Sequence, residues 1–261
     1  MNGITPVESL LRRDRWLVAG VLLLVSALCW AWIVPMARAM DRMMCGDTSW
    51  MMMNAWDARH LTVLFIMWSV MMVCMMLPSV APTLLLYAGV IRKSPEAGRT
   101  ATHVHAFAGG YLLVWTVFSV AATLLQRVFA DLLWVSPLME SENRGLSALL
   151  LLTAGVYQFT PFKRTCLDGC RSPVEFLTRH WRRGIGGGFR LGLLHGLYCV
   201  GCCWALMLLL FVGGVMNLWW IIALTIFVLV EKLAPFGVQG GRLSGALAFA
   251  LGLWVLARAI F

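Results

Sequence analysis

Residues 61–91 read LTVLFIMWSVMMVCMMLPSVAPTLLLYAGVI, and this stretch decides the fold class. It contains no charged residue. A helix needs about 20 mostly apolar residues to cross a hydrocarbon core roughly 30 Å thick. The stretch is long enough to cross a bilayer as a helix, although Pro78 and Pro82 each remove a backbone hydrogen-bond donor from it. Part of this helix is therefore expected to face protein or a cavity.

Similar apolar segments recur along the whole chain. Apolar residues make up 61% of the 261 residues and charged residues 13%, against about 45–50% and about 25% in soluble proteins. The composition predicts an all-α fold, a polytopic transmembrane helix bundle that forms a single domain over residues 1–261 in the lipid bilayer. Seven spans are predicted, near Trp16–Met36, Leu61–Ile91, Val104–Gln126, Leu146–Phe162, Ile185–Val212, Leu218–Ala234 and Leu243–Phe261. The first could be a signal peptide, but its length and its three tryptophans favour a retained helix.

The distribution of basic residues predicts the orientation of the bundle. The chain carries a net charge of +9, and fifteen of its 21 Lys and Arg residues fall on one side of the predicted spans. By the positive-inside rule this side is cytoplasmic, so the N-terminus is expected inside and the C-terminus outside. A basic loop over residues 163–190 is then cytoplasmic, and a methionine-rich loop over residues 37–60 lies outside. The basic charge is accounted for by topology and anionic lipid, so a nucleic-acid partner is rejected.

The fifth predicted span carries the strongest candidate site. It reads HGLYCVGCCWALM over residues 195–207. On a helix that turns about 100° per residue, His195, Cys199, Cys202 and Cys203 share one face, and Met207 follows beside them. An ionisable residue within a span is a functional candidate by default.

Two further groups of candidate ligands lie elsewhere. The second span has a sulfur stripe with helical spacing, and Cys166 and Cys170 lie one turn apart if the cytoplasmic loop is helical there. The members of the stripe are Met67, Met71, Met72, Cys74, Met75 and Met76. Counting inward from the span ends places Met75 and Cys199 near mid-membrane, where the second and fifth spans could meet.

Thiolate and thioether sulfur are soft ligands that select Cu(I), whereas Zn²⁺ prefers cysteine, histidine and carboxylate in a closed tetrahedron. The sequence therefore predicts Cu(I) transport or delivery, with zinc as the weaker candidate. In this hypothesis the outer loop, with Met40, Met43, Met44, Cys45, Met51, Met52 and Met53, captures the ion. Cys166 and Cys170 would exchange it at the cytoplasmic face.

Other polar residues receive simpler interpretations. Glu231 and Lys232 are expected to snorkel to the inner interface. His103, His105 and His180 are expected to be solvated. The eight cysteines are expected to be free thiols, because only Cys45 falls on the oxidising side.

Two alternatives to copper remain open at this stage. Cys199-Val-Gly-Cys202 has the spacing of a reactive thiol pair, so the protein could be an enzyme, an intramembrane thiol–disulfide relay that uses Cys166 and Cys170 as its second pair. It could instead be a structural subunit of a larger membrane complex. In that case Gly188, Gly192 and Gly196 would form a small-residue seam for close helix packing, and methionine would be simple packing material.

Three blocks of the sequence resemble one known family. They are residues 67–82 (MWSVMMVCMMLPSVAP), residues 154–173 (AGVYQFTPFKRTCLDGCRSP) and residues 196–207 (GLYCVGCCWALM), the last continuing through 214–218 and 231–235. Together they resemble the bacterial family of predicted metal-binding integral membrane proteins. The resemblance implies copper handling, a multi-pass position in the bacterial inner membrane, and a small soluble metal-handling partner. Cys74 departs from the family pattern, where a small apolar residue is expected.

Overall fold

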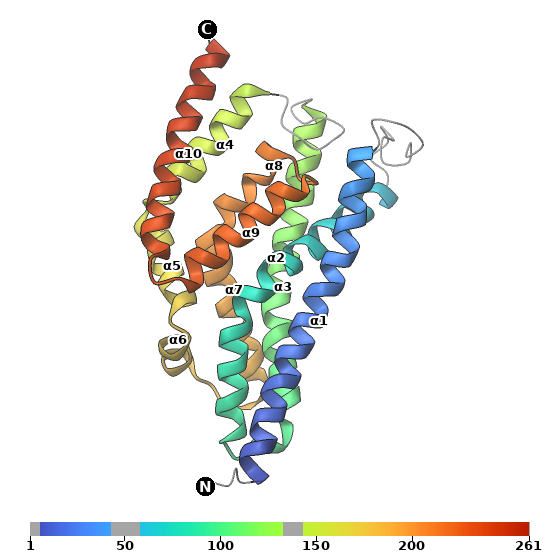
Figure 1. The fold of residues 1–261 in the computed structure, drawn as a ribbon, viewed down its shortest axis with the longest axis vertical. Coiled ribbons are helices and arrows are strands. Elements are labelled where there is room, and N and C mark those ends of the chain that lie inside the picture. Colours follow the sequence, from blue (N-terminus) through green and yellow to red (C-terminus); the bar gives the residue numbers. More distant parts are fainter. Residues whose placement is uncertain (1–5, 43–57, 133–142, 261) are drawn as a thin grey trace.

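The computed structural model describes residues 6–42, 58–132 and 143–260, and within the first helix it describes the side chains of residues 20–38. All regular structure in these segments is helical, and the two ends of the chain lie at opposite ends of the elongated bundle (Figure 1). The all-α prediction is therefore confirmed. The outer-loop residues Met43, Met44, Cys45, Met51, Met52 and Met53 lie outside the described residues, as do the side chains of Met40 and its neighbours.

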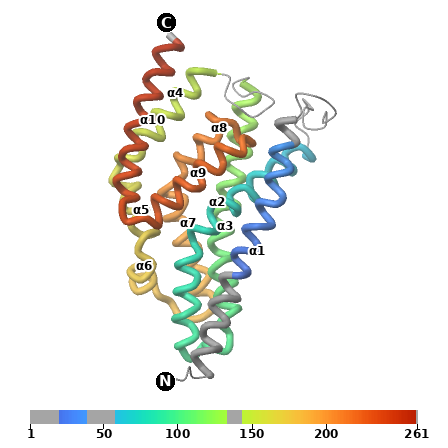
Figure 2. The backbone as a smooth tube through the Cα atoms, viewed as in Figure 1, coloured from blue at the N-terminus to red at the C-terminus, as the bar shows by residue number. Residues whose placement is uncertain are grey.

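The bundle is built from long helices with shorter ones between them. The long helices are α1 (Pro6–Arg42), α2 (Ala58–Arg92), α3 (Thr100–Asp131), α7 (Gly184–Leu208), α9 (Leu218–Leu233) and α10 (Gly237–Ile260). The shorter elements are η2 (Ala97–Arg99), α4 (Arg144–Tyr157), α5 (Pro161–Arg171), α6 (Pro173–His180) and α8 (Leu210–Gly213). The tube in Figure 2 shows α9 crossing the bundle between α10 on one side and α1 on the other.

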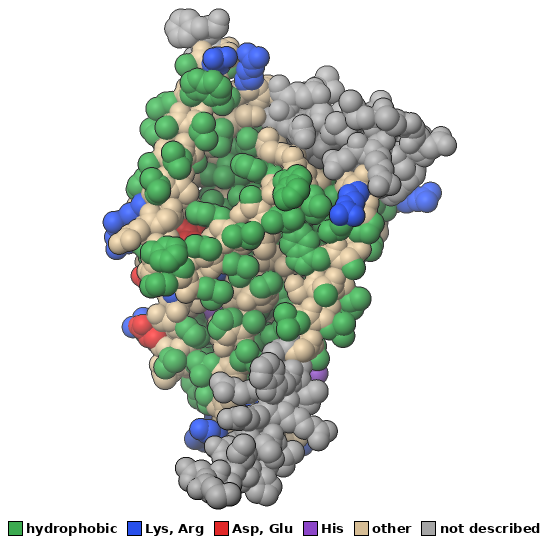
Figure 3. Space-filling view, viewed as in Figure 1, with side chains coloured by type: hydrophobic (Ala, Val, Ile, Leu, Met, Phe, Trp, Pro, Cys, Tyr) green, Lys and Arg blue, Asp and Glu red, His purple; other side chains and the backbone are tan. Residues whose placement is uncertain are grey.

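Among the described residues, five helices are long and apolar enough to cross a membrane, or six if the bent pair α4 and α5 counts as one span. α9 has only 16 residues, but it matches the predicted sixth span closely. The visible face of the bundle is covered mainly by apolar side chains, as expected for contact with lipid (Figure 3). These features fit a membrane protein. Seven crossings and a cytoplasmic N-terminus remain predictions.

The fourth predicted span is wrong in detail. The helix stops at Tyr157, and α5 then leaves it at an angle of 67°. Thr160 caps the new helix, because its side chain accepts a hydrogen bond from the Lys163 amide, and Pro161 fits the first turn, where no amide partner is needed. The basic connection after this span begins with two short helices, α5 and α6, and α5 packs against α7.

The glycine seam of α7 is occupied within the chain by α3. A side chain at Gly192 would overlap the backbone of Phe107 in α3, and one at Gly196 would come within 2.9 Å of Val114. The absence of side chains at these positions lets the two helices pack at close range. α3 therefore fills the seam that was considered as a docking face for another subunit.

Candidate metal site of buried thiols

The three cysteines of α7 are buried and share a helix face, as the spacing predicted. Cys199, Cys202 and Cys203 are each at most 1% exposed. The thiols of Cys202 and Cys203 both donate to the Cys199 carbonyl, at 3.1 and 2.9 Å. This is the back-bonding expected three and four residues along a helix.

A fourth thiol reaches this group from α5. The Cys170 side chain lies near the Cys199 and Cys202 thiols. Cys166 is also buried and lies beside Gly201, where an added Cβ would come within 2.7 Å of its Sγ atom. The prediction that Cys166 and Cys170 lie one turn apart is confirmed, because both belong to α5. Their predicted place on the cytoplasmic side remains a prediction, and α5 packs on α7. We refer to Cys170, Cys199, Cys202 and Cys203 as the thiol cluster.

Lys232 of α9 projects into the thiol cluster. Its Nζ atom lies 2.9 Å from the Cys199 Sγ atom, 3.3 Å from the Ser79 hydroxyl and 3.9 Å from the Met76 Sδ atom. The side chain is only 4% exposed, so the expected snorkelling to the interface is wrong. A buried ammonium group costs several kcal/mol unless it is compensated.

Glu231, the neighbour of Lys232, points to a different partner and is also buried rather than snorkelling. Its carboxylate accepts from the Lys163 Nζ atom at 2.7 and 2.9 Å, and both side chains are 2% exposed. The guanidinium of Arg171 donates to the carbonyls of Glu231 and Ala234, at 2.7 and 2.8 Å, and so caps the end of α9. Two cations of α5 thus fix the segment that carries Lys232.

Tyr111 of α3 closes another side of the cluster. Its hydroxyl lies 3.1 Å from the Cys199 Sγ atom and donates to the Met76 carbonyl at 3.2 Å. The sequence interpretation missed both Tyr111 and Lys232. A signal for Lys232 was present, because a charged residue in an apolar span is itself a functional candidate. No sequence spacing could indicate Tyr111, since its partner lies 88 residues away.

The methionine stripe of α2 is buried, but most of it lies apart from the thiols. Met67, Met71, Met72, Met75 and Met76 are each at most 1% exposed. α3 packs extensively against both α2 and α7. In the described part of the chain, Met76 is the stripe residue that reaches the cluster, because its Sδ atom lies 3.9 Å from the Lys232 Nζ atom.

Three further predicted ligands, Cys74, Met207 and His195, are also buried. Cys74 is buried near Cys29 of α1, away from the thiol cluster. Met207 is also buried, at 1% exposure. His195 packs among the rings of Phe107, Tyr111 and Phe176, with centroid distances of 5.0 to 6.0 Å.

The His195 Nδ1 atom has no hydrogen-bond partner within the described segments. His103 is buried as well, with Glu96 at 3.6 Å, so its predicted solvation is wrong.

The cluster is not a preformed coordination shell. Within residues 6–42, 58–132 and 143–260, no three His, Cys, Asp or Glu side chains are already arranged to hold a metal ion. The seven cysteines in these segments are free thiols. Two thiols of the cluster are turned toward a carbonyl and one toward an ammonium, so binding a soft ion requires small rotations of side chains that are already neighbours.

Comparison with known protein families shows which family the chain belongs to. A family model described as PpoB2, a copper chaperone, matches residues 65–255, which is well over half of the chain and includes every member of the cluster. The protein belongs to this copper chaperone family. Its function is therefore related to copper. No curated protein and no solved structure matches the chain.

Proposed function

We propose that this member of the copper chaperone family binds Cu(I) at the thiol cluster and passes it to a partner from within the membrane. One observation carries the proposal: the buried ammonium group of Lys232 lies 2.9 Å from the Cys199 Sγ atom, on a helix face that also carries Cys202 and Cys203. Cysteine sulfur selects Cu(I) among the first-row metals, so the donor set fits the cargo that the family handles.

The charge balance of the cluster supports a monovalent ion. One Cu(I) ion held by a pair of thiolates carries a net charge of −1, which the Lys232 ammonium compensates. A neutral group of charges is far less costly in a low-dielectric interior than a charged one. Lys232 is already in place 2.9 Å from Cys199, so the protein does not have to reorganise to supply this compensation.

The surroundings favour copper over zinc. The nearest carboxylate on α9, that of Glu231, is engaged by Lys163 at 2.7 Å and is not free to act as a ligand. The remaining close donor is the thioether of Met76, which is soft. Four cysteine thiolates can hold Zn²⁺ in a closed tetrahedron, but such a site would carry a net charge of −2, of which the single Lys232 ammonium compensates only half.

The placement of the cluster supports transfer within a membrane. α2, α3, α7 and α9 all contribute a group that contacts it, and α2, α3 and α7 are long and apolar enough to cross a bilayer. We propose a multi-pass protein of the bacterial inner membrane with a cytoplasmic N-terminus. Its acceptor would be a small soluble metal-handling protein or a larger membrane complex. The direction of transfer is left to experiment.

Metal content is the measurement that tests the proposal. Purified protein in detergent would be loaded with Cu(I) under reducing conditions, challenged with a Cu(I) chelator and analysed by mass spectrometry. Near-stoichiometric copper is expected in the wild type and in Cys29→Ser/Cys74→Ser, because these two thiols lie away from the cluster. Copper should be lost in Cys199→Ser/Cys202→Ser and strongly reduced in Cys170→Ser. Equal copper in all variants would disprove the site.

A thiol–disulfide relay is the second candidate, and one observation favours it. Cys170 lies within reach of Cys199 and Cys202, so disulfide exchange between α5 and α7 is geometrically feasible. Oxidation of such a pair releases two electrons and two protons to an acceptor. A relay would keep its activity when Met76 is replaced by leucine and would need no copper. Copper-independent oxidation of a reduced thiol substrate would favour it over the chaperone.

A further inference from the structure

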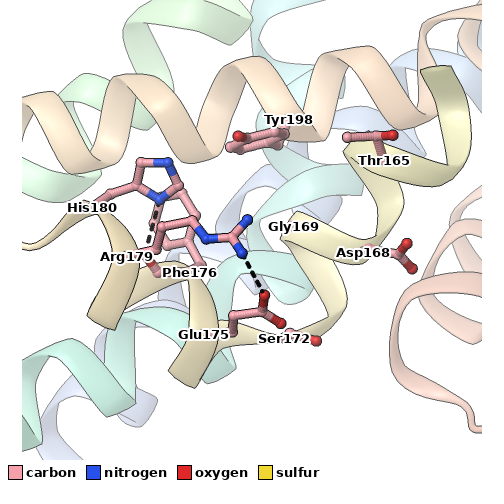
Figure 4. A pocket seen from close by; sticks show the side chains of 9 residues that line it. All are labelled: Thr165, Asp168, Gly169, Ser172, Glu175, Phe176, Arg179, His180 and Tyr198. Carbon is pink, nitrogen blue, oxygen red and sulfur yellow. Dashed lines mark hydrogen bonds and ion pairs between the residues drawn. The ribbon is translucent and has the colours of Figure 1, made fainter.

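A polar pocket lies next to the helices that carry the thiol cluster. It has a volume of about 380 Å³ and lies among α5, α6 and α7 (Figure 4). Two of its lining residues are direct chain neighbours of the cluster, since Gly169 precedes Cys170 and Tyr198 precedes Cys199. The pocket is therefore separated from the thiols by little more than the helices that carry them.

His180 is the one imidazole in the lining of this pocket. Its Nδ1 atom lies 3.1 Å from the Phe176 carbonyl. A carbonyl can only accept, so Nδ1 carries the hydrogen and Nε2 keeps its lone pair. This is the tautomer in which histidine binds a metal ion, oriented by a backbone carbonyl as metal-ligating histidines usually are. The neighbouring charges of Glu175 and Arg179 are paired with one another at 3.3 Å and leave the imidazole unengaged (Figure 4).

Phe176 stands between this imidazole and the buried one. Its ring centroid is 5.1 Å from that of His180 and 5.0 Å from that of His195. Phe176 is 3% exposed, and His195 is 2% exposed with an Nδ1 atom that has no partner among the described residues. His195 in turn lies one helical turn before Cys199 and packs on Tyr111, whose hydroxyl contacts the Cys199 sulfur.

We infer that this pocket is the port through which Cu(I) reaches and leaves the thiol cluster. His180 is the outer ligand, Phe176 is the gate, and His195 is the inner ligand that passes the ion to Cys199. An unpartnered nitrogen buried in an aromatic shell is costly unless it is used. A transient copper bond to the Nδ1 atom of His195 gives that nitrogen a partner, and the Phe176 ring, which packs against both histidines, has to rotate to let the ion pass. The inference rests on the proposed function.

Transfer kinetics test the port separately from the site. The probe is Cu(I) as its bicinchoninate complex, whose loss of absorbance reports uptake by the detergent-purified protein. His180→Gln keeps a donor for the Phe176 carbonyl but removes the imidazole, so uptake should slow about ten-fold while the final copper content stays at the wild-type value. His105→Gln, at an exposed histidine of α3 away from the pocket, is the matched control and should load at the wild-type rate.

The gate is tested in the opposite direction. Phe176→Leu should accelerate uptake and release several-fold, again at constant final copper content, whereas Phe176→Trp should slow both. Unchanged rates in His180→Gln and in both Phe176 variants would overturn the port.

A measurement without copper keeps the two proposals distinguishable. A small cationic methanethiosulfonate reagent should modify Cys199 and Cys202 faster in Phe176→Leu than in the wild type, as followed by peptide mass spectrometry. Faster modification in a protein that retains no copper would uphold the access route and reject the copper site. Retained copper with equal modification rates would uphold the site and reject the gate.

Discussion

Glu231 and Lys232 are adjacent in the sequence, yet they enter two regions of different character. The carboxylate of Glu231 meets the ammonium of Lys163 in a compact buried pair, and Arg171 caps the backbone beside it. Lys232 instead faces a thiol, a thioether and two hydroxyl-bearing side chains that lie around Cys199. The first region is closed, because each charge has a matching and permanent partner. The second contains soft groups that can exchange their present partners for a metal ion. The first region therefore stabilises the fold, and the second is the candidate metal site.

The largest effect is expected from breaking the closed pair. Lys163→Met leaves the Glu231 carboxylate buried without a partner, which costs about 3–5 kcal/mol of stability. The double variant Lys163→Met/Glu231→Gln should recover most of that loss, because no charge is then left unpaired. Thermal unfolding in detergent measures both. The exposed pair of Glu175 and Arg179 is the control, where Arg179→Gln should change stability by about 0–1 kcal/mol.

The next effect separates the two regions most clearly. Lys232→Met should unfold near the wild-type temperature, because the thiols it leaves behind can stay protonated and uncharged. Its affinity for Cu(I) should fall about 10- to 100-fold, in line with the roughly 1.5–3 kcal/mol of a hydrogen bond to a charged group. Competition with a Cu(I) chelator measures the affinity. A stability loss as large as that of Lys163→Met, with unchanged copper affinity, would contradict the division into two regions.

A smaller effect is expected at Tyr111. Tyr111→Phe removes the hydroxyl that contacts the Cys199 sulfur and the Met76 carbonyl but keeps the ring beside His195. A lost hydrogen bond of this kind is worth about 0.5–1.5 kcal/mol, so copper affinity should fall a few-fold. The same chelator competition measures it. Tyr87→Phe is a suitable control, since the described residues include no hydrogen-bond partner for the Tyr87 hydroxyl and copper affinity should not change.

The smallest effects concern the methionine stripe. Met76→Leu and Met67→Leu conserve side-chain volume, so each should cost less than about 1.5 kcal/mol of stability. Only Met76→Leu should speed copper release, by a few-fold, because Met76 is the stripe residue with a contact to Lys232. Stopped-flow transfer to a chelator resolves the difference. Identical copper release rates for the two variants would show that the methionine stripe contributes only to packing.

Much of the candidate site could be predicted because it obeys helical spacing. Cys199, Cys202 and Cys203 lie three and four residues apart, and a helix places such residues on one face wherever it packs. Cys166 and Cys170 follow the same rule within α5. The burial of Lys163 against Glu231 could not be predicted in this way, because the two residues lie 68 positions apart on different helices.

The sequence by itself determined the helical class, the apolar segments and the soft donor set, because composition and spacing along one helix are local properties. The tertiary structure alone decided which helices meet. It brought Cys170 near the thiols of α7, packed α3 against both α2 and α7, and turned Lys232 inward. A buried ammonium group is tolerated only where several chain-distant groups compensate it together. No single segment carries that information, because the compensation comes from Ser79 and Met76 of α2 and from Cys199 of α7.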